Sequence, residues 1–272
     1  MDWNKTKTIF IIVFSILNVF LYSLYLKSYN EAQIIEPLGD EASIHEKLQA
    51  DRIKYDSLSK VPEQESYVTG NVRVYSLEEL QPRKNQTIQI VDGTQLVAIF
   101  NEPVLIQNVQ DALSFEEFAI ANIENGASYE LWEIDEEKRK AVLFQKVRNH
   151  LIFNNSNAKI TLYWNENQEM IRYEQTEFEE LEAFGEGLVN LLAEEEVVKT
   201  LYARNLLKTE SFIEDITLGY STLVNFTETQ VFAPTWHVSV KSKDGLIEDY
   251  FVNAVEGKII EFTKESEEPQ EE

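Results

Sequence analysis

The sequence contains no cysteine and only three histidines among its 272 residues. The absence of cysteine excludes disulfides, thiol catalysis and thiolate metal sites. His45, His150 and His237 lie too far apart in sequence for the paired ligands of a zincin-type metal site, and we expect each to be structural. The chain has no Gly-x-Ser-x-Gly elbow, Walker loop or calcium-binding loop. The sequence therefore predicts no catalytic residue, no cofactor, no metal site and no enzyme.

Basic residues are scarce as well, since 24 Lys and Arg face 48 Asp and Glu, which gives a formal net charge of −24. Lys5, Lys7 and Lys27 flank the first apolar segment, where Asp2 is the single acid, so the rest of the chain is two charges more negative, at −26. Phosphate repels a surface this acidic. We therefore expect no nucleic-acid partner and no binding of the body to anionic lipid.

The longest apolar run extends from Thr8 to Leu26. At about 1.5 Å per residue it is long enough to cross a bilayer as one helix. A cleaved signal peptide is the alternative, but no small-x-small cleavage site ends the run. Lys5 and Lys7 precede the run and only Lys27 follows it closely. The positive-inside rule then predicts a single-pass protein of the cell membrane with a cytoplasmic N-terminus and an extracellular body.

Polar and semi-polar residues of this run share one side of the predicted helix. Thr8, Ser15, Asn18, Tyr22 and Tyr25 follow the three- and four-residue steps of a helix–helix seam. A mid-membrane Asn without a protein partner is costly, which favours a pairing face. Because tyrosines near the outer end also serve as interface anchors, a tyrosine belt in accidental phase is the alternative. The predicted partner-binding residues are Ser15, Asn18, Tyr22 and Tyr25.

Capping boxes and turn residues indicate the secondary structure of the body. The boxes are Ser43 with Glu46, Ser114 with Glu117, and Thr176 with Glu179, the last of which predicts a long helix that reaches Leu201. Asp92-Gly93 is the strongest hairpin signal, and further strand pairs are predicted around 135–140, 165–167, 227–230, 244–245 and 256–257. Helices that stand apart from runs of hairpins indicate an α+β fold with antiparallel sheets.

The order of helix followed by strands occurs twice, which predicts two subdomains. The predicted organisation is a cytoplasmic N-terminus (1–7), a transmembrane helix (8–26), a tether (27–42), a first extracytoplasmic subdomain (43–175), a second subdomain with PepSY-like hairpins (176–263) and an acidic disordered tail (264–272).

Two segments resemble the YycI (WalI) family. The opening residues 1–11, MDWNKTKTIFI, followed by a single membrane helix, are fairly specific to it. The closing Trp236-His237-Val238 and residues 250–258, YFVNAVEGK, also resemble PepSY-type hairpins more broadly. The resemblance covers essentially the whole chain before the acidic tail.

The resemblance implies a non-enzymatic accessory regulator of the WalK/WalR (YycG/YycF) two-component system, which controls cell-wall metabolism in low-GC Gram-positive bacteria. The implied partners are the sensor kinase WalK (YycG), contacted through membrane helices, and a second single-pass protein, YycH. A homodimer of the ectodomain is a further prediction.

Three alternatives stay open. In a PepSY-type ectodomain that binds a ligand or modulates a peptidase, Trp236, Tyr250 and Phe251 would offer aromatic surface, although core packing also explains them. An extracellular hydrolase needs only two carboxylates, and 48 acidic residues make that signal unspecific. Structural anchoring in the envelope is the third.

Overall fold

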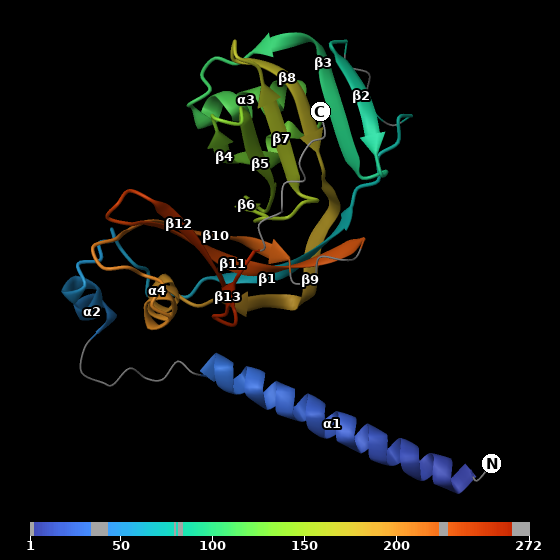
Figure 1. Cartoon of the computed structure of the whole chain (residues 1–272), viewed down its shortest axis with the longest axis vertical. Helices are drawn as coiled ribbons and strands as arrows, with labels where there is room; N and C mark the ends of the chain where they lie inside the picture. The colour runs from blue at the N-terminus through green and yellow to red at the C-terminus, as the bar shows by residue number, and fades with distance from the viewer. Residues whose placement is uncertain (1–2, 34–42, 79, 81–83, 223–227, 263–272) are drawn as a thin grey trace.

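A computed structural model describes residues 3–33, 43–78, 80, 84–222 and 228–262. It consists of one long N-terminal helix and a body of two antiparallel sheets with helices (Figure 1). The predicted α+β class is confirmed. The acidic tail from 264 onward and residues 34–42 of the tether lie outside the described residues.

The N-terminal helix, α1, spans Trp3–Gln33 and contains the predicted membrane segment. Its stretch Lys7–Leu24 is long and apolar enough to cross a membrane, and none of that stretch is buried. The helix continues to Gln33, so the first residues of the predicted tether are helical. This long, apolar helix is consistent with a single membrane anchor.

The first sheet has six strands, and two helices cover part of one of its faces. Its strands are β1 (Gln64–Val72), β9 (Phe178–Asn190), β10 (Phe212–Thr222), β11 (Thr229–Lys241), β12 (Ile247–Asn253) and β13 (Ile259–Ile260). The helices are α2 (Ile44–Ala50) and α4 (Glu194–Ala203), which bury Leu48 and Leu201 against Trp236 and Val238 of β11. Burial of these apolar side chains is the main stabilising term of this half of the body.

The second sheet has seven strands and carries one helix on one of its faces. Its strands are β2 (Gln86–Val91), β3 (Gln95–Leu105), β4 (Tyr129–Asp135), β5 (Lys140–Val147), β6 (His150–Leu151), β7 (Lys159–Trp164) and β8 (Glu169–Gln175). The helix α3 (Ala112–Asn122) buries Phe115 and Phe118 against this sheet, and the short 3-10 helix Gly126–Ser128 follows it. The predicted hairpin at Asp92-Gly93 joins β2 and β3, with both turn residues at positive φ.

The long helix predicted from Thr176 to Leu201 is wrong. Residues 178–190 form strand β9, and only α4 beyond it is helical. Gly185 and Gly187 adopt φ of 90° and 133°, which an α-helix does not permit. Pairing with β1 therefore outweighs the helical periodicity of this segment.

Two smaller boundaries also differ from the prediction. The capping box of Ser43 and Glu46 is present, but α2 ends at Ala50, because Arg52 turns to a φ of 57°. The helix predicted from Ser114 begins earlier, with Asp111 at its N-cap, and the Ser114 hydroxyl donates to the Asp111 carboxylate.

The chain crosses between the two sheets twice, after β1 and after β8, and the two crossings lie side by side. The backbone N–H of Arg73 donates to the carbonyl of Glu177 at 2.9 Å. The Arg73 guanidinium also donates to the carboxylates of Glu177 at 2.6 Å and Glu124 at 2.9 Å. Burial alone would lower the pKa of Arg73, but these hydrogen bonds more than offset it and raise the pKa. The guanidinium lies 4.8 Å from the centre of the Tyr75 ring.

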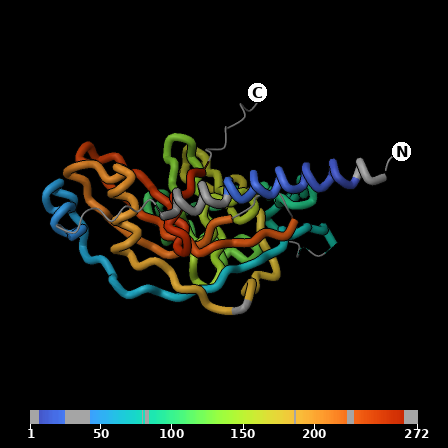
Figure 2. The backbone as a smooth tube through the Cα atoms, turned by 90° about the horizontal axis from the view of Figure 1, so that it is seen from below, coloured from blue at the N-terminus to red at the C-terminus, as the bar shows by residue number. Residues whose placement is uncertain are grey.

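Apolar packing joins the sheets at a second place. Phe153 of the loop after β6 donates its backbone N–H to the Tyr220 carbonyl of β10 at 2.8 Å. Its ring lies so close to Gly219 that an added Cβ would meet it at 2.2 Å. A glycine at 219 is therefore what allows β10 to approach this loop. β1 and β9 run side by side at one edge of the six-stranded sheet (Figure 2).

We predict that Arg73→Met lowers the free energy of unfolding by about 3 kcal/mol, because it leaves the buried Glu177 carboxylate without its cationic partner. The side chains of Arg73 and Glu177 are only 16% and 7% exposed. Urea unfolding of the full chain in detergent measures the change. Arg139→Met, which removes an exposed pair with Glu166, is the matched control and should cost less than about 1 kcal/mol. Equal effects of the two substitutions would contradict the importance of the buried pair.

Candidate functional site

The predicted pairing face on α1 keeps its polar side chains on the surface of the helix. The side chains of Ser15, Asn18 and Tyr22 are exposed, whereas that of Tyr25 lies outside the described residues. The Asn18 amide donates to the Phe14 carbonyl at 2.9 Å, one turn earlier in the helix. This bond satisfies one donor of the amide and lowers the cost of placing Asn18 in a bilayer.

Asn18 still presents a carbonyl oxygen and a second N–H, the groups that an adjacent helix can bind. Residues on other sides of α1, such as Ile12, Val13 and Phe20, are exposed and purely apolar, as lipid contact requires. The helix thus has one polar side and otherwise a lipid-compatible surface.

One cluster in the body has the residue types of a catalytic triad, because a hydroxyl, a histidine and a carboxylate follow one another within hydrogen-bond distance. Thr217 Oγ1 lies 3.3 Å from His237 Nδ1, and His237 Nε2 lies 2.7 Å from Asp249 Oδ1. Thr217 and His237 are direct cross-strand partners of β10 and β11. The His237 ring packs edge-on to Trp132, with centroids 4.9 Å apart, and stacks on Phe251 at 5.0 Å. The arrangement is a hydrogen-bonded packing layer between the sheets, which fits the structural role predicted for His237.

The other two histidines also have structural partners. His45 Nδ1 lies 2.6 Å from the Tyr55 hydroxyl. His150 Nδ1 lies 3.0 Å from the Leu218 carbonyl, where β6 meets β10. Within the described residues no three His, Asp or Glu side chains are grouped as a metal site would require. The geometry therefore gives these histidines positions in the packing of the body.

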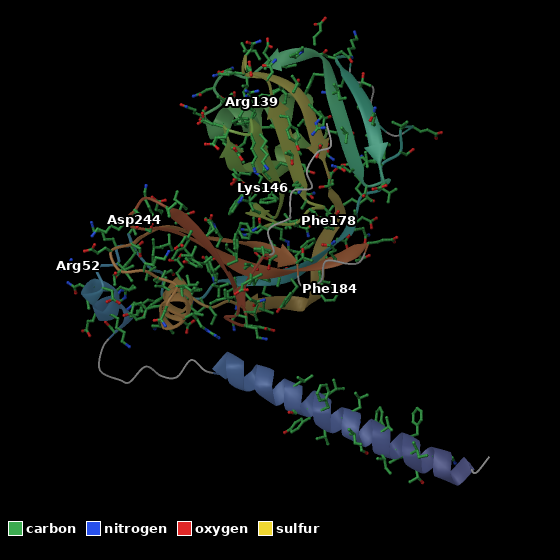
Figure 3. The ribbon with its side chains drawn as sticks, viewed as in Figure 1. Arg52, Arg139, Lys146, Phe178, Phe184 and Asp244 are labelled. Atoms are coloured by element: carbon green, nitrogen blue, oxygen red, sulfur yellow. The ribbon has the colours of Figure 1, made fainter. Side chains whose placement is uncertain are left out.

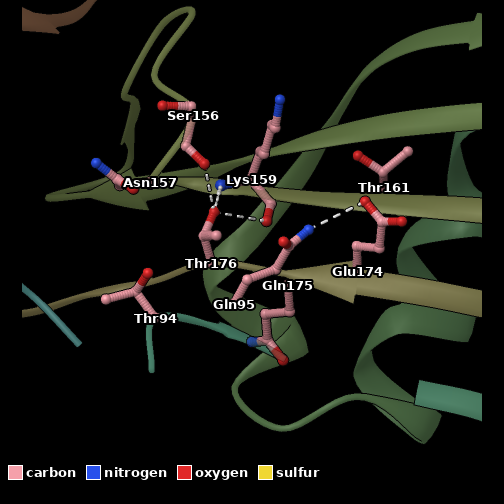
Figure 4. Close-up of a pocket in the computed structure, with 9 residues that line it drawn as sticks. All are labelled: Thr94, Gln95, Ser156, Asn157, Lys159, Thr161, Glu174, Gln175 and Thr176. Atoms are coloured by element: carbon pink, nitrogen blue, oxygen red, sulfur yellow. Dashed lines mark hydrogen bonds between the residues drawn. The ribbon is translucent and has the colours of Figure 1, made fainter. Parts of the chain in front are cut away.

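A polar cavity of about 240 Å³ opens between the turn before β7 and the strands β3 and β8 (Figure 4). Ser156 and Lys159 line it with the Ser-x-x-Lys spacing of acyl-enzymes, a signal that the sequence analysis missed. The two residues lie on a turn and a strand, and their side chains point in different directions in Figure 4. Glu174 in the same cavity accepts a hydrogen bond from Gln95 at 3.1 Å. No nucleophile and base are brought together here.

The aromatic residues of the PepSY-type alternative belong to the core. Trp236 and Phe251 are buried, and the Trp236 indole donates to the Leu192 carbonyl at 2.9 Å. Tyr250 is half-buried and donates to the Leu206 carbonyl at 2.9 Å, and burial, with Glu248 nearby, raises its pKa to about 12. Core packing therefore accounts for these aromatic side chains better than a ligand site does.

The fold defines the class of the protein. It is an α+β body that follows a single apolar helix, which is consistent with a membrane anchor. Within that class the chain belongs to the YycI family, whose model, described as "YycI protein", matches residues 32–255. A comparison with curated proteins finds no match.

Two solved structures are similar in part. An uncharacterized protein from Eubacterium rectale has a TM-score of 0.47 at 10% identity, over 78% of this chain and 92% of that one. YycH from Bacillus subtilis has a TM-score of 0.40 at 14% identity, over 71% of this chain and 53% of that one, so this chain spans about half the length of that protein.

We predict that Phe251→Ala lowers the free energy of unfolding by about 3–4 kcal/mol, because it removes a core aromatic side chain. Phe251 is 6% exposed, whereas Leu246, just before the same strand, is 67% exposed. Leu246→Ala is therefore the control and should change stability by less than about 0.5 kcal/mol. Thermal unfolding of the full chain in detergent distinguishes the two. A neutral Phe251→Ala would favour a ligand-binding surface at this hairpin.

Proposed function

We propose that the protein is a non-enzymatic membrane regulator that adjusts the activity of the WalK sensor kinase and acts together with YycH. Membership of the YycI family carries this proposal, since the resemblance implies both partners. The polar side of α1 around Asn18 supports it, because it offers a surface that another membrane helix can bind. The proposed orientation is a cytoplasmic N-terminus and an extracellular body, on the positive-inside rule.

The proposed mechanism is a bias on the packing of the kinase's membrane helices. Contact through Ser15, Asn18 and Tyr22 favours one of two packings, and the body, paired with YycH, sets how often contact is made. A partner shifts such an equilibrium only by its differential affinity for the two states. Coupling of about 1–3 kcal/mol is the usual range for such effects.

The proposed contacts lie in two places, on the polar side of α1 within the membrane and on the body outside it. A homodimer of the ectodomain remains a separate proposal.

We predict that Asn18→Leu and Ser15→Leu weaken in-membrane association with WalK by about three- to twentyfold, in line with roughly 0.6–1.7 kcal/mol for a polar contact between membrane helices. Energy transfer between labelled full-length chains in vesicles measures the association. Ile12→Ala and Val13→Ala, off the polar side, are the controls and should leave it unchanged.

Kinase autophosphorylation in the same vesicles gives the functional readout. Variants that weaken association should also weaken the effect of the protein on WalK, whichever its sign. Equal effects of substitutions on and off the polar side would rule out the pairing face.

A further inference from the structure

The outermost strand of the six-stranded sheet is almost entirely uncovered. β9 pairs only with β1, so its other edge is open as far as the described residues go. From Glu179 to Asn190, only Leu181 and Val189 are half-buried, and every other described side chain is exposed. An open edge leaves alternate backbone N–H and C=O groups unpaired, a template for an added strand.

Two bulges shape this edge. The register with β1 shifts around Glu180, whose φ is 52°, and again after Phe184, where Gly185–Leu188 have no counterparts beyond Ser66. The regular stretch between the bulges is Glu182–Phe184. Bulges at sheet edges re-aim side chains and limit pairing to a defined length. The open edge thus suits a short extended segment.

Phe184 is the aromatic anchor of this edge. It is 51% exposed, more than any other aromatic side chain in the described residues beyond α1. It stands opposite Tyr67 of β1, and Leu188 in the second bulge is 62% exposed. Figure 3 shows Phe178 at the end of β9 nearest the seven-stranded sheet and Phe184 farther along the strand. Exposed aromatic side chains are enriched at protein interfaces and dominate their energies.

The negative charge of β9 determines which kind of segment can bind its open edge. Glu179 and Glu182 are exposed and take part in none of the ion pairs seen among the described residues, and Glu180 accepts a hydrogen bond from Asn71. The strand has no Lys or Arg, so a second copy would place Glu against Glu. The acidic residues 265–272 and anionic lipid are excluded for the same reason.

We infer that the edge of β9 binds an extended, basic segment of a partner protein, with Phe184 as its apolar anchor. The added strand forms main-chain hydrogen bonds along Glu182–Phe184, and its cations pair with Glu179 and Glu182. The inference rests on the proposed function, because that function supplies an extracellular partner.

The test uses full-length chains in lipid nanodiscs, with full-length YycH and full-length WalK as the two probes. The variants are Phe184→Ser and the double substitution Glu179→Lys with Glu182→Lys. Two lost charge pairs and a lost anchor should weaken binding of at least one probe by about tenfold. Both variants change exposed side chains, and an unchanged melting temperature confirms that they fold.

The control for charge is the double substitution Glu136→Lys with Glu137→Lys, in the exposed turn between β4 and β5. It changes the net charge equally and should leave binding unchanged. Amide hydrogen exchange over residues 178–190 should slow when the probe binds, as strand addition requires. Raised salt should weaken binding of the probe to the native chain more than binding to the double variant Glu179→Gln with Glu182→Gln.

Each outcome decides between the two proposals. Unchanged binding of both probes, with Asn18→Leu still weakening association with WalK, would overturn the β9 inference alone. Equal loss from the β9 and turn variants would show only general attraction to an acidic body and would also overturn it. If substitutions in α1 leave association with WalK unchanged and substitutions in β9 leave binding of both probes unchanged, the proposed function is overturned as well.

Discussion

The body depends on the clamp at which the chain crosses between its two sheets. β1 begins the six-stranded sheet, the chain then builds the whole seven-stranded sheet, and it returns through Glu177 to add β9 and the four later strands to the first sheet. The outgoing and returning segments are joined by Arg73, which binds Glu177 through both its backbone and its side chain. A buried charge pair of this kind is costly to break one partner at a time, so the two crossings are held in one register.

Other contacts between the sheets build on this register. Arg148 of the turn after β5 donates to Glu65 of β1 at 2.9 Å, and burial raises the pKa of Tyr220 beside this pair. The aromatic layer of Trp132, Phe153 and Phe251 fills the remaining space. The two sheets therefore pack against each other through this aromatic layer. This packing presents β9 as a fixed edge, because β9 starts at the clamp itself.

The sequence was sufficient for the hairpins of the body and insufficient for β9. Asp92-Gly93 gives its turn in any context, because both residues tolerate positive φ. Residues 178–190 carry helical periodicity, and only pairing with β1, more than a hundred residues earlier in the chain, makes them a strand. The polar side of α1 was readable from spacing alone, since a helix in lipid has a fixed period. The Arg73 clamp was not, because nothing local links Arg73 to Glu124 and Glu177.

A weak contact in the membrane and a weak contact outside it can act together. A polar contact between membrane helices contributes only about 0.6–1.7 kcal/mol, and exposed charge pairs about 0.2–1 kcal/mol each. Anchoring to one bilayer makes the second contact intramolecular once the first has formed, so the combined affinity exceeds either one. In the proposed interface, an acidic edge at Glu182 would also select basic partners, whereas Asn18 alone would accept any polar helix. In the proposed function, such a division would assign selection of the partner to the body and coupling to the membrane helix.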